Sequence, residues 1–360
     1  MQVSVRQWAI LCFVPLFVYC SMPVENNDQK PEVNSEIQPG SHQTDQYFER
    51  LQGNKIGLVT NQTGTIGKVL LVDTLIEAGI EVAKIFSPEH GFRGNEDAGK
   101  HVESSVDKKT GIPLVSLYGK NKKPSVEMLE GIDIMVFDIQ DVGARFYTYI
   151  STLHYVMEAC AENSIPLIIL DRPNPNGHYV DGPVLDMEFN SFVGMHPVPI
   201  VYGMTIGEYG QMINGESWLK NGVQCELTVV PCKNYNHQSK YSLPIPPSPN
   251  LKSDLAIAYY PSLCLFEPTV ISVGRGTNRP FEVFGHPSFK DKLEYSFTPV
   301  STVGASAPKL EFQTCYGIDM AKLGTNRLRR LRLDIFVNAY KQYGTGDSFF
   351  TSKSFFNKLI

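Results

Sequence analysis

The sequence predicts an α/β protein with a parallel β-sheet in its first part and a smaller domain after it. Short apolar runs rich in Val, Ile and Leu alternate with helix-like stretches in the first part of the chain. These runs are nearly continuous in apolar residues, which is typical of parallel strands covered by helices on both faces. Proline- and glycine-rich segments then interrupt the pattern over residues 180–205. We therefore expect a Rossmann-like parallel sheet domain, a second, smaller mixed α/β domain, and a cleft between them.

The expected elements follow one another in a regular order. Strands are expected over residues 56–59, 82–86, 113–119, 132–138 and 165–171, and helices over residues 69–79 and 148–163. Beyond the break, Met204 opens another helical stretch, and residues 225–232 alternate like a half-buried strand. We assign residues 46–200 to the Rossmann-like domain and residues 201–360 to the ancillary domain.

The composition is that of a globular protein and argues against a nucleic-acid partner. The chain has 360 residues, of which 42% are hydrophobic and 19% charged, and its net charge is −5. This length accommodates two domains with cores of their own, whereas phosphate binding requires clustered positive charge. The basic run over residues 327–332 (RLRRLR) has no interleaved aromatic residue, so we interpret it as the solvated face of a helix or strand.

The N-terminal residues have the pattern of an export signal. Arg6 precedes a hydrophobic stretch over residues 8–19, too short to span a bilayer, and Cys20 follows directly. Residues 1–20 resemble a bacterial lipoprotein signal in which Cys20 carries the lipid; a plain secretory signal cleaved nearby is the alternative. The polar residues 21–45 suit a flexible tether. We expect an exported, periplasmic or outer-membrane lipoprotein of a bacterium, which contacts the membrane only through its lipid anchor.

Neither a metal site nor a disulfide framework is expected. The cysteines from Cys160 onward show no CxxC spacing. His90, Asp138, Asp141 and Asp171 could together hold a metal ion, but no HxH, HExxH or DxD spacing supports this. The sequence also lacks a GxGxxG fingerprint and a G-x-S-x-G nucleophile elbow. We therefore expect no metal and no cofactor.

Polar side chains follow four of the predicted strands. The groups are Thr60, Asn61 and Gln62; Glu89 and His90; Asp138, Gln140 and Asp141; and Asp171, Arg172 and Asn174. In an open parallel sheet, ligands bind outside the carboxyl ends of the strands, so these groups are expected at one rim. Asn, Asp and Pro also form turns, and a single such turn is more often structural. Four turns with this density of acids and amides favour a polar pocket.

A glycine-flanked arginine provides a further candidate. Arg275 lies in SVGRGTNRPFE, and Arg279 and Glu282 follow on the same loop. The glycines allow the backbone to approach a ligand while the guanidinium binds it; a salt-bridged turn is the structural alternative. Thr205 and Glu208 have the spacing of a capping box, so we interpret Glu208 as structural.

Together, these segments resemble the exo-β-N-acetylmuramidases of the NamZ type, glycoside hydrolase family 171, formerly a domain of unknown function. The resemblance extends from about residue 51 to residue 282, and more weakly to the end of the chain. It is carried by GLVTNQTG, FSPEHGFRG, FDIQDVGARFYTYISTL, LDRPNPNG, DGPVLD, SFVG, YGMTIGE, PPSPN, CLFEPTVISVGRGTNRPFE and FGHP.

The resemblance implies an enzyme that cleaves N-acetylmuramic acid from the non-reducing ends of peptidoglycan glycan fragments, in cell wall recycling. It also implies that a Rossmann-like catalytic domain and an ancillary domain flank the site, and that the glutamate of SPEHG, Glu89, is catalytic. This sequence departs from the family in two places. Asp181 stands in DGPVLD where glutamate is common, and the chain ends at SFFNKLI where relatives continue, so the ancillary domain is expected to be truncated.

Glycoside hydrolysis needs a protonated carboxyl group and usually a second, ionised one. We assign Glu89 as the general acid and consider Asp138, Asp171 and Asp181 for the second carboxylate. The 2-acetamido group of the substrate could instead act as internal nucleophile. Arg275 or Arg279 could bind the lactyl carboxylate of muramic acid. The full set of expected substrate-binding residues is Asn61, His90, Gln140, Arg145, Asp181, Arg275, Arg279 and Glu282.

Two other classes of function remain open. A membrane-tethered sugar-binding lipoprotein without catalysis would also have two α/β domains around a cleft, and Phe146, Tyr147 and Tyr149 offer aromatic surface for a sugar. A metal-dependent hydrolase acting on phosphate or acetyl groups is the third possibility. The sequence makes no prediction of the oligomeric state.

Overall fold

The structure, a computed structural model, describes residues 36–89, 91 and 92, 105–324 and 327–360. Residues Ile37–Ile360 form one compact unit. Cys20 and the expected signal peptide lie outside the described residues, and so does His90. None of the helices in the described part is long and apolar enough to cross a membrane.

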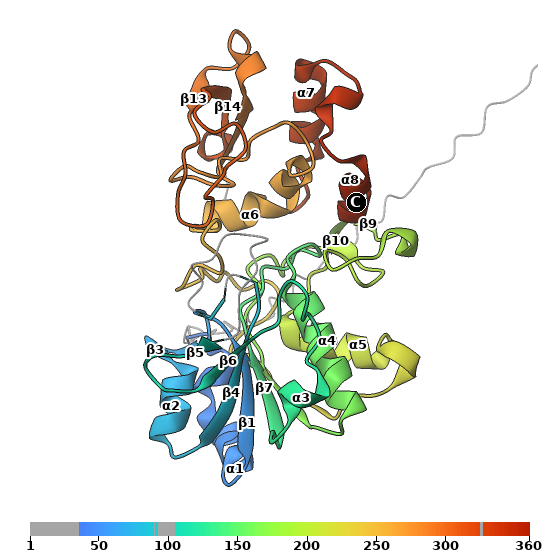
Figure 1. The fold of residues 1–360 in the computed structure, drawn as a ribbon. Helices are drawn as coiled ribbons and strands as arrows, with labels where there is room; N and C mark the ends of the chain where they lie inside the picture. The colour runs from blue at the N-terminus through green and yellow to red at the C-terminus, as the bar shows by residue number, and fades with distance from the viewer. Residues whose placement is uncertain (1–35, 90, 93–104, 325–326) are drawn as a thin grey trace, which may run out of the picture. The chain divides into compact units, whose positions relative to one another are not determined.

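A seven-stranded sheet forms the centre of the first part of the chain (Figure 1). Its spatial order is β11-β8-β7-β1-β4-β6-β5, and every neighbouring pair is parallel except β5 with β6. The strands are β1 (Lys55–Thr60), β4 (Glu81–Ser87), β5 (Ser105–Val106), β6 (Pro113–Ser116), β7 (Ile134–Asp138), β8 (Leu167–Leu170) and β11 (Leu227–Val230). Apart from β5, this is the doubly wound Rossmann order, with its switch point between β1 and β7. The predicted fold class is confirmed.

Helices cover both faces of this sheet, which explains why its strands are mostly apolar. On one face, Leu58 and Val136 pack with helices α1 (Phe48–Leu51) and α2 (Leu71–Glu77). On the other face, their neighbours Val59 and Phe137 pack with residues of helices α4 (Tyr149–Glu162) and α5 (Ile206–Gly215). Successive residues of these central strands therefore enter opposite cores, which favours apolar side chains at both. Figure 1 shows α2 and α4 on opposite sides of the strands.

The two helices predicted for this domain match the structure to different degrees. Helix α4 (Tyr149–Glu162) is confirmed almost to the residue. Helix α2 begins two residues later than expected, because Val69 and Leu70 form strand β3, which pairs with β2 (Thr65–Ile66) in a hairpin. The chain turns at Gly79, whose φ of 75° is left-handed and favours glycine, just after α2 ends.

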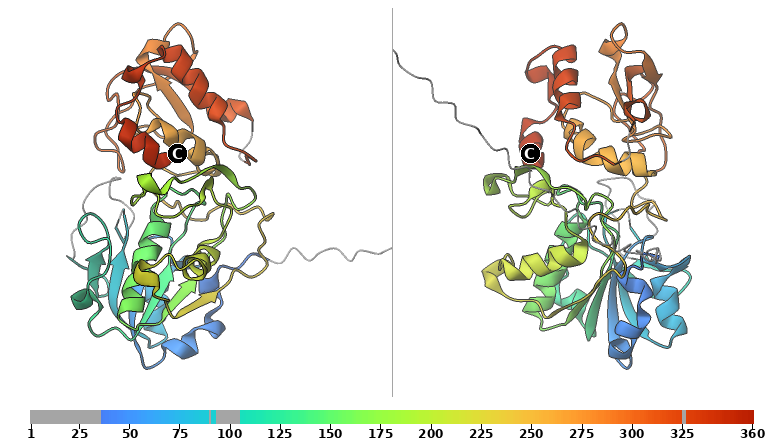
Figure 2. Two further views of the ribbon diagram at one scale, coloured as in Figure 1. Left: turned by 90° about the vertical axis from the view of Figure 1, so that its right-hand side faces the viewer. Right: turned by 180° about the vertical axis from the view of Figure 1, so that it is seen from behind.

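The second part of the chain contains a small antiparallel sheet and three helices (Figure 2). The sheet has the order β12-β14-β13. Its strands are β12 (Val283–His286), β13 (Tyr295–Phe297) and β14 (Cys315–Asp319), and the helices are α6 (Asp254–Leu263), α7 (Leu333–Tyr343) and α8 (Lys353–Leu359). The short remaining elements are α3 (Val126–Leu129), the pair β9 (Asp181–Val184) and β10 (Pro199–Val201), and the 3-10 helices η1 (Gly40–His42), η2 (Thr44–Gln46), η3 (Met187–Phe189), η4 (Lys220–Gly222), η5 (Cys264–Phe266), η6 (Pro287–Phe289), η7 (Met320–Leu323) and η8 (Asp347–Phe349).

The boundary expected at residues 200 and 201 does not follow the sheet. Strand β11 (Leu227–Val230) lies beyond it, yet pairs in parallel with β8. One apolar cluster also extends from Val59 in β1 to Leu359 in α8. The Pro/Gly-rich break reflects the irregular chain around the β9–β10 pair, which interrupts the regular alternation before the last strand of the sheet is added.

Two further expectations need correction. The tether predicted over residues 21–45 is wrong for its last part, because Gln38 pairs with Lys233 and the amide of Gly40 donates to the carbonyl of Asp171. These polar residues are held by backbone hydrogen bonds, which hydropathy does not reveal. The basic run over residues 327–332 is irregular and precedes α7, and its Leu328 and Leu331 are buried.

The five cysteines in the described part of the chain are unpaired. Four are buried and Cys232 is half-buried. Burial raises the pKa of the Cys315 thiol to about 12, and that of Cys225 likewise, so both are held as neutral thiols. These cysteines therefore serve as small apolar residues in the structure.

Candidate active site

The carboxyl ends of β1 and β7 are tied together at the switch point of the sheet. The hydroxyl of Thr60 donates to the carbonyl of Asp138 over 2.9 Å, and the amide of Gln140 donates to the hydroxyl of Thr63 over 3.0 Å. Because this is where ligands bind in doubly wound sheets, the loops after these strands define the candidate site.

Glu89 follows β4 at this rim and is half-buried. It accepts a hydrogen bond of 3.0 Å from the hydroxyl of Thr148, the residue before helix α4. The hydroxyl of Tyr118, which follows β6, also bonds to it, and burial together with the nearby Glu89 charge raises the pKa of Tyr118. Thr148 therefore uses its hydroxyl for Glu89 rather than for capping α4. Two hydroxyls from two separate loops hold this carboxylate in place.

Asn61 follows β1 and bonds to residues of the neighbouring segments. Its side-chain Nδ2 donates to the hydroxyl of Tyr149 over 3.0 Å, and its side-chain oxygen accepts from the backbone amide and the hydroxyl of Thr63. Tyr149 in turn donates to the carbonyl of Pro247, as does Tyr147. Asn61 has no exposed surface. It therefore fixes the proline-rich PIPPSPN loop over the rim rather than facing it.

Asp138 is paired with Arg172 inside the protein. The Nε and Nη2 atoms of Arg172 lie 2.6 and 3.0 Å from the two carboxylate oxygens. Asp138 has no exposed surface and Arg172 has 5%. This bidentate pair satisfies both carboxylate oxygens, and it links the loops after β7 and β8.

Asp171 has a similar internal role at the end of β8. It accepts hydrogen bonds from the hydroxyl of Thr205 at 2.8 Å and from the amide of Gly207 at 2.7 Å, in the first turn of α5. Burial raises its pKa to about 6. The predicted capping box of Thr205 and Glu208 is confirmed in the same turn. Asp171 thus holds the N-terminus of α5 against the sheet.

Asp141 is a buried carboxylate to which the sequence analysis gave no catalytic role. One oxygen accepts from the amide of Gly143 at 2.7 Å and from the hydroxyl of Tyr202. The other, Oδ1, is buried and bonds to no other described residue. Burial raises the pKa of Asp141 to about 6. No spacing signal distinguishes it, because Gly143 offers only its backbone amide and Tyr202 is distant in the chain.

Three of the expected substrate-binding residues have their polar groups engaged by the backbone. The side-chain Nε2 of Gln140 donates to the backbone carbonyls of Asp141 and Pro173, each at 2.8 Å. The two oxygens of Asp181 accept from the amides of Gly182 and Leu331.

Arg145 is the third of these residues and has no exposed surface. Its Nη1 donates to the carbonyls of Pro183 and Val198, and its Nη2 to those of Leu359 and Ile360 at 2.9 and 2.7 Å. Burial lowers its pKa to about 10. The structure therefore favours a structural role, in which Arg145 joins the β9–β10 pair to α8.

The two arginines of the loop over residues 272–282 have different surroundings. Arg279 binds Asp319 through Nη1 and Nη2, each at 2.7 Å, and Glu282 through Nε at 3.0 Å. Glu282 also accepts from the hydroxyl of Ser253, which caps α6. Arg275 binds Glu267 through Nε at 2.9 Å and lines a cavity of about 360 Å³.

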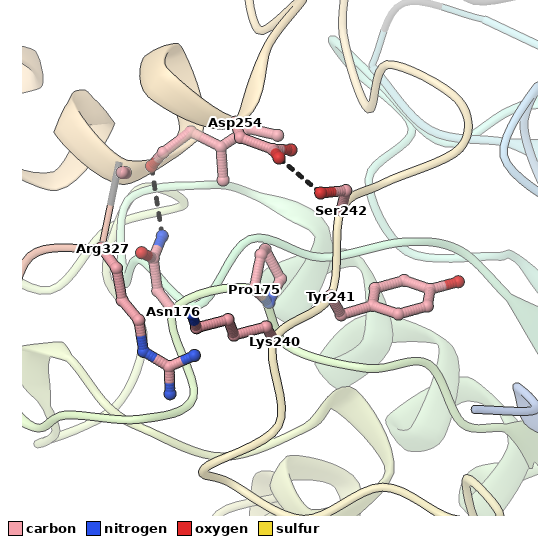
Figure 3. Close-up of a pocket in the computed structure, with 9 residues that line it drawn as sticks. Pro175, Asn176, Lys240, Tyr241, Ser242, Asp254 and Arg327 are labelled. Atoms are coloured by element: carbon pink, nitrogen blue, oxygen red, sulfur yellow. Dashed lines mark hydrogen bonds between the residues drawn. The ribbon is translucent and has the colours of Figure 1, made fainter. Parts of the chain in front are cut away.

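A second cavity, of about 220 Å³, lies between the loop after β8 and helix α6 (Figure 3). Asn176 crosses its wall and donates to the carbonyl of Ile257 at 3.1 Å, while Ser242 donates to Asp254. Lys240 and Arg327 give its lining a positive charge. Among the described residues, no group of three His, Cys, Asp or Glu side chains is arranged to hold a metal ion.

The structure thus places Glu89 after β4, at the same edge of the sheet at which Asp138, Asp141 and Asp171 stand at the ends of β7 and β8. Sequence reasoning missed Thr148 and Tyr118, two described residues that bond to Glu89, because a hydroxyl in a loop carries no signal of its own. The fold and this rim define a class: an α/β protein with a carboxylate site at the switch point of a parallel sheet.

The comparisons place the chain within that class. The family models for "Exo-beta-N-acetylmuramidase NamZ, N-terminal" and "C-terminal" match residues 56–255 and 258–360. The chain belongs to the exo-β-N-acetylmuramidase NamZ family, and the resemblance found in the sequence is confirmed. The two models meet at the start of α6 (Asp254–Leu263), well beyond the boundary expected at residue 200.

Three relatives are informative. The chain is 39% identical over 328 residues to the peptidoglycan β-N-acetylmuramidase NamZ of Bacillus subtilis (strain 168), covering 86% of this chain and 78% of that protein. It is also similar to two crystal structures of DUF1343 family proteins from Bacteroides fragilis NCTC 9343. One has a TM-score of 0.81 at 47% identity and covers 91% of this chain and 88% of that one. The other has a TM-score of 0.68 at 33% identity and covers 79% and 76%.

Proposed function

We propose that this protein is an exo-acting glycoside hydrolase that releases N-acetylmuramic acid from the non-reducing ends of peptidoglycan glycan fragments. Its family and its relative in B. subtilis support this reading. The single structural observation that carries it is the position of Glu89, half-buried at the end of β4 and bonded by hydroxyls from two loops. The binding-only alternative gains no support from the comparisons.

Glu89 is the group that we assign to proton transfer. It gives its proton to the glycosidic oxygen as the bond to the anomeric carbon breaks, and it later takes a proton from the attacking water. Hydroxyl groups suit this exchange because they rotate between donating and accepting. Thr148 and Tyr118 can therefore remain bonded to Glu89 in both of its protonation states.

The partners of the other acids support a substrate-assisted route. Asp138, Asp171 and Asp181 have their oxygens engaged by internal donors. None of these three is placed to attack a sugar without breaking those bonds. In the route that we propose, the acetamido oxygen of the substrate bonds to the anomeric carbon as the glycosidic bond breaks. Water then opens the cyclic intermediate and restores the acetamido group.

The product assay tests this function directly. The purified protein is incubated with the disaccharide N-acetylmuramyl-N-acetylglucosamine, and free N-acetylmuramic acid is measured by mass spectrometry. We expect release by the native protein, and a loss of at least about a thousandfold in Glu89→Gln with an unchanged melting temperature. Release at a near-normal rate by Glu89→Gln would remove Glu89 from the mechanism. Binding without any product would support the sugar-binding alternative, and inactivation by a chelator would support a metal-dependent hydrolase.

A substrate series tests the acetamido route. Aryl muramides with an acetamido and a trifluoroacetamido group at carbon 2 differ in the nucleophilicity of that carbonyl oxygen. If the oxygen attacks, the fluorinated substrate reacts at least about tenfold more slowly, although its leaving group is the same. Equal rates would favour a protein carboxylate as nucleophile.

We also propose that the protein is exported and lipidated at Cys20. The support is the sequence pattern of residues 1–20. Labelling of expressing cells with a radioactive fatty acid, followed by detergent phase partitioning, tests the idea. We expect label and detergent-phase recovery for the native chain, and neither for Cys20→Ala. An unlabelled, secreted product from the native chain would instead indicate a plain secretory signal.

A further inference from the structure

The cavity beside Arg275 has the size of a sugar substituent or a small sugar. It measures about 360 Å³, within the range of small-molecule sites. Two chain segments line it, residues 267–275 and residues 304–309. The carbonyl of Gly304 accepts from the side-chain Nδ2 of Asn250 at 2.8 Å, which ties this wall to the proline-rich loop over residues 244–250.

The backbone around Arg275 is built to hold this residue in one position. The amide of Thr277 donates to the carbonyl of Gly274, and Gly276 has a φ of 78°, as in a type II turn with Arg275 at its second position. A Cβ atom at Gly276 would lie 2.5 Å from a ring carbon of Pro308 in the opposite cavity wall. Only glycine fits there, so the turn lies directly against the cavity.

The guanidinium of Arg275 keeps unused donors. Its Nε binds Glu267, and its Nη1 and Nη2 make no hydrogen bond to another described residue. The side chain is 24% exposed, so these donors are within reach of solvent. Arg279, by contrast, uses all three of its nitrogens on Glu282 and Asp319. Arg275 is therefore the arginine of this loop whose two terminal nitrogens are available to bind a ligand.

A strained residue supports this guanidinium from behind. The Cζ atom of Arg275 lies 4.9 Å from the centroid of the Phe281 ring, which is almost fully buried. Phe281 has a φ of 59°, a left-handed conformation that is unfavourable for a bulky residue. Its amide donates to the carbonyl of Val273 at 2.8 Å, which fixes the strained position. The ring contributes a cation–π contact and limits the motion of the guanidinium.

The remaining charges leave the cavity net positive. Lys309 donates its ammonium protons to the carbonyls of Phe266, Glu267, Thr269 and Ile271, at the end of helix η5. Its charge thus stays in the wall while its donors are used. Arg275 and Lys309 together outweigh Glu267. This lining favours a planar anion such as a carboxylate.

A row of aromatic rings runs from Arg275 to Tyr149, whose hydroxyl is close enough to Glu89 to be affected by its charge. Phe281 contacts Tyr260 at 5.0 Å between ring centroids, and Tyr260 contacts Tyr147 at 5.7 Å. Tyr147 contacts Tyr149 at 4.8 Å. Burial, and after it the charge of Glu89, raises the pKa of Tyr149. The two sites therefore belong to one packed assembly rather than to unrelated surfaces.

We propose that the Arg275 cavity is the subsite for a substrate carboxylate, and that the two terminal nitrogens of Arg275 bind both of its oxygens. This rests on the proposed function, under which the carboxylate is that of the lactyl ether of N-acetylmuramic acid. The cavity then determines specificity for muramic acid over N-acetylglucosamine, which has the same ring without the lactyl group.

Three aryl glycosides test the proposal: the muramide, its lactyl methyl ester, and the N-acetylglucosaminide. For Arg275→Met we expect kcat/KM on the muramide to fall by about a hundredfold, the size of a lost charge-assisted pair. On the ester and the glucosaminide we expect less than a threefold change. Arg275→Lys keeps the positive charge but not the paired terminal nitrogens. Its kcat/KM on the muramide should lie between the values of the native protein and of Arg275→Met. Arg332→Met, which removes an arginine paired with a carboxylate elsewhere, is the matched control and should behave like the native protein.

A binding measurement separates failure of this inference from failure of the proposed function. Calorimetry with free N-acetylmuramic acid and with its methyl ester needs no turnover. Tighter binding of the acid by the native protein, lost in Arg275→Met, would support the subsite. Equal binding of acid and ester, or equal losses of Arg275→Met on all three glycosides, would overturn it even if the enzyme is an active muramidase. A native protein without turnover but with carboxylate-dependent binding would overturn the proposed function alone.

Discussion

Thr148 donates its hydroxyl hydrogen to Glu89 over 3.0 Å, and so connects the residue before helix α4 with the loop after strand β4. The longest helix in the described part of the chain thereby fixes the direction of the proposed catalytic acid. Helix α4 is buried along most of its length, so this support is rigid. Loops alone would not hold a carboxylate with the same accuracy.

This contact makes Thr148 a positioning residue. In Thr148→Val the shape is kept and the donor is lost, so we expect kcat to fall by about tenfold with little change in KM. Thr148→Ser retains a hydroxyl and should recover most of the activity. Thr152→Val is the control, because its hydroxyl donates to the carbonyl of Thr148 one turn further along α4 and not to Glu89. Steady-state kinetics on a chromogenic muramide decide the matter; unchanged kcat in Thr148→Val would contradict the assignment.

The Asp138–Arg172 pair is expected to act on stability and not on chemistry. Asp138→Asn leaves a buried guanidinium without its counter-charge, which costs about 3–5 kcal/mol in the free energy of unfolding. The double variant Asp138→Asn with Arg172→Met should recover part of that loss. Urea unfolding measures both. If Asp138 were instead the second catalytic carboxylate, Asp138→Asn would lose its activity at temperatures where it is fully folded.

Arg145 gives a second prediction of stability. Arg145→Met leaves four backbone carbonyls without their donors, so we expect a loss of at least about 3 kcal/mol in the free energy of unfolding. Arg332→Met should lose less than about 1 kcal/mol, because its partner Asp334 is 55% exposed. Activity per folded molecule should stay close to normal in Arg145→Met. A selective loss of substrate binding would restore the role expected from the sequence.

Asp141 should contribute to the pH dependence of the free energy of unfolding. Its pKa in the folded protein is about 6, above the value of 3.8 for an ordinary aspartate, because burial disfavours its charged form. The protonated Asp141 therefore adds to the free energy of unfolding in full below pH 4. This stabilisation is lost as the pH rises through 6. The difference of roughly 2 between the two pKa values corresponds to about 3 kcal/mol.

In Asp141→Asn this part of the pH dependence should disappear, since the amide cannot ionise. Urea unfolding of the native and variant proteins between pH 4 and pH 7 checks the expectation. The matched control is Asp45→Asn, which removes an exposed aspartate. A pH profile identical in the native protein and Asp141→Asn would show that Asp141 does not titrate in this range.

The sheet could be predicted from the sequence because its pattern is local. Residues 134–137 (IMVF) are apolar at every position, and both faces of strand β7 are indeed buried. The rim was predictable for the same reason, since the residues after each strand are known once the strands are. The β2–β3 hairpin was missed because Val69 and Leu70 also fit the helical spacing of the residues that follow.

The roles of individual side chains were harder to predict, because they depend on partners distant in the chain. Arg145 binds the carbonyls of Leu359 and Ile360, more than two hundred residues away. Asp138 finds its partner on the loop after β8, and Arg279 finds Asp319 on β14. A carboxylate beside a strand end looks the same in the sequence whether it faces a ligand or a guanidinium. Tertiary contacts alone distinguish these cases.

The unpaired thiols of the core have a practical consequence. Because none of the five described cysteines is bridged, this part of the chain needs no oxidation step to reach its final form, and reducing agents should leave it intact. Cys160 and Cys264 lie inside the apolar cluster, so an alkylating reagent can modify them only when that cluster opens. The rate of their modification therefore measures how often the packed interior separates, without any label being introduced.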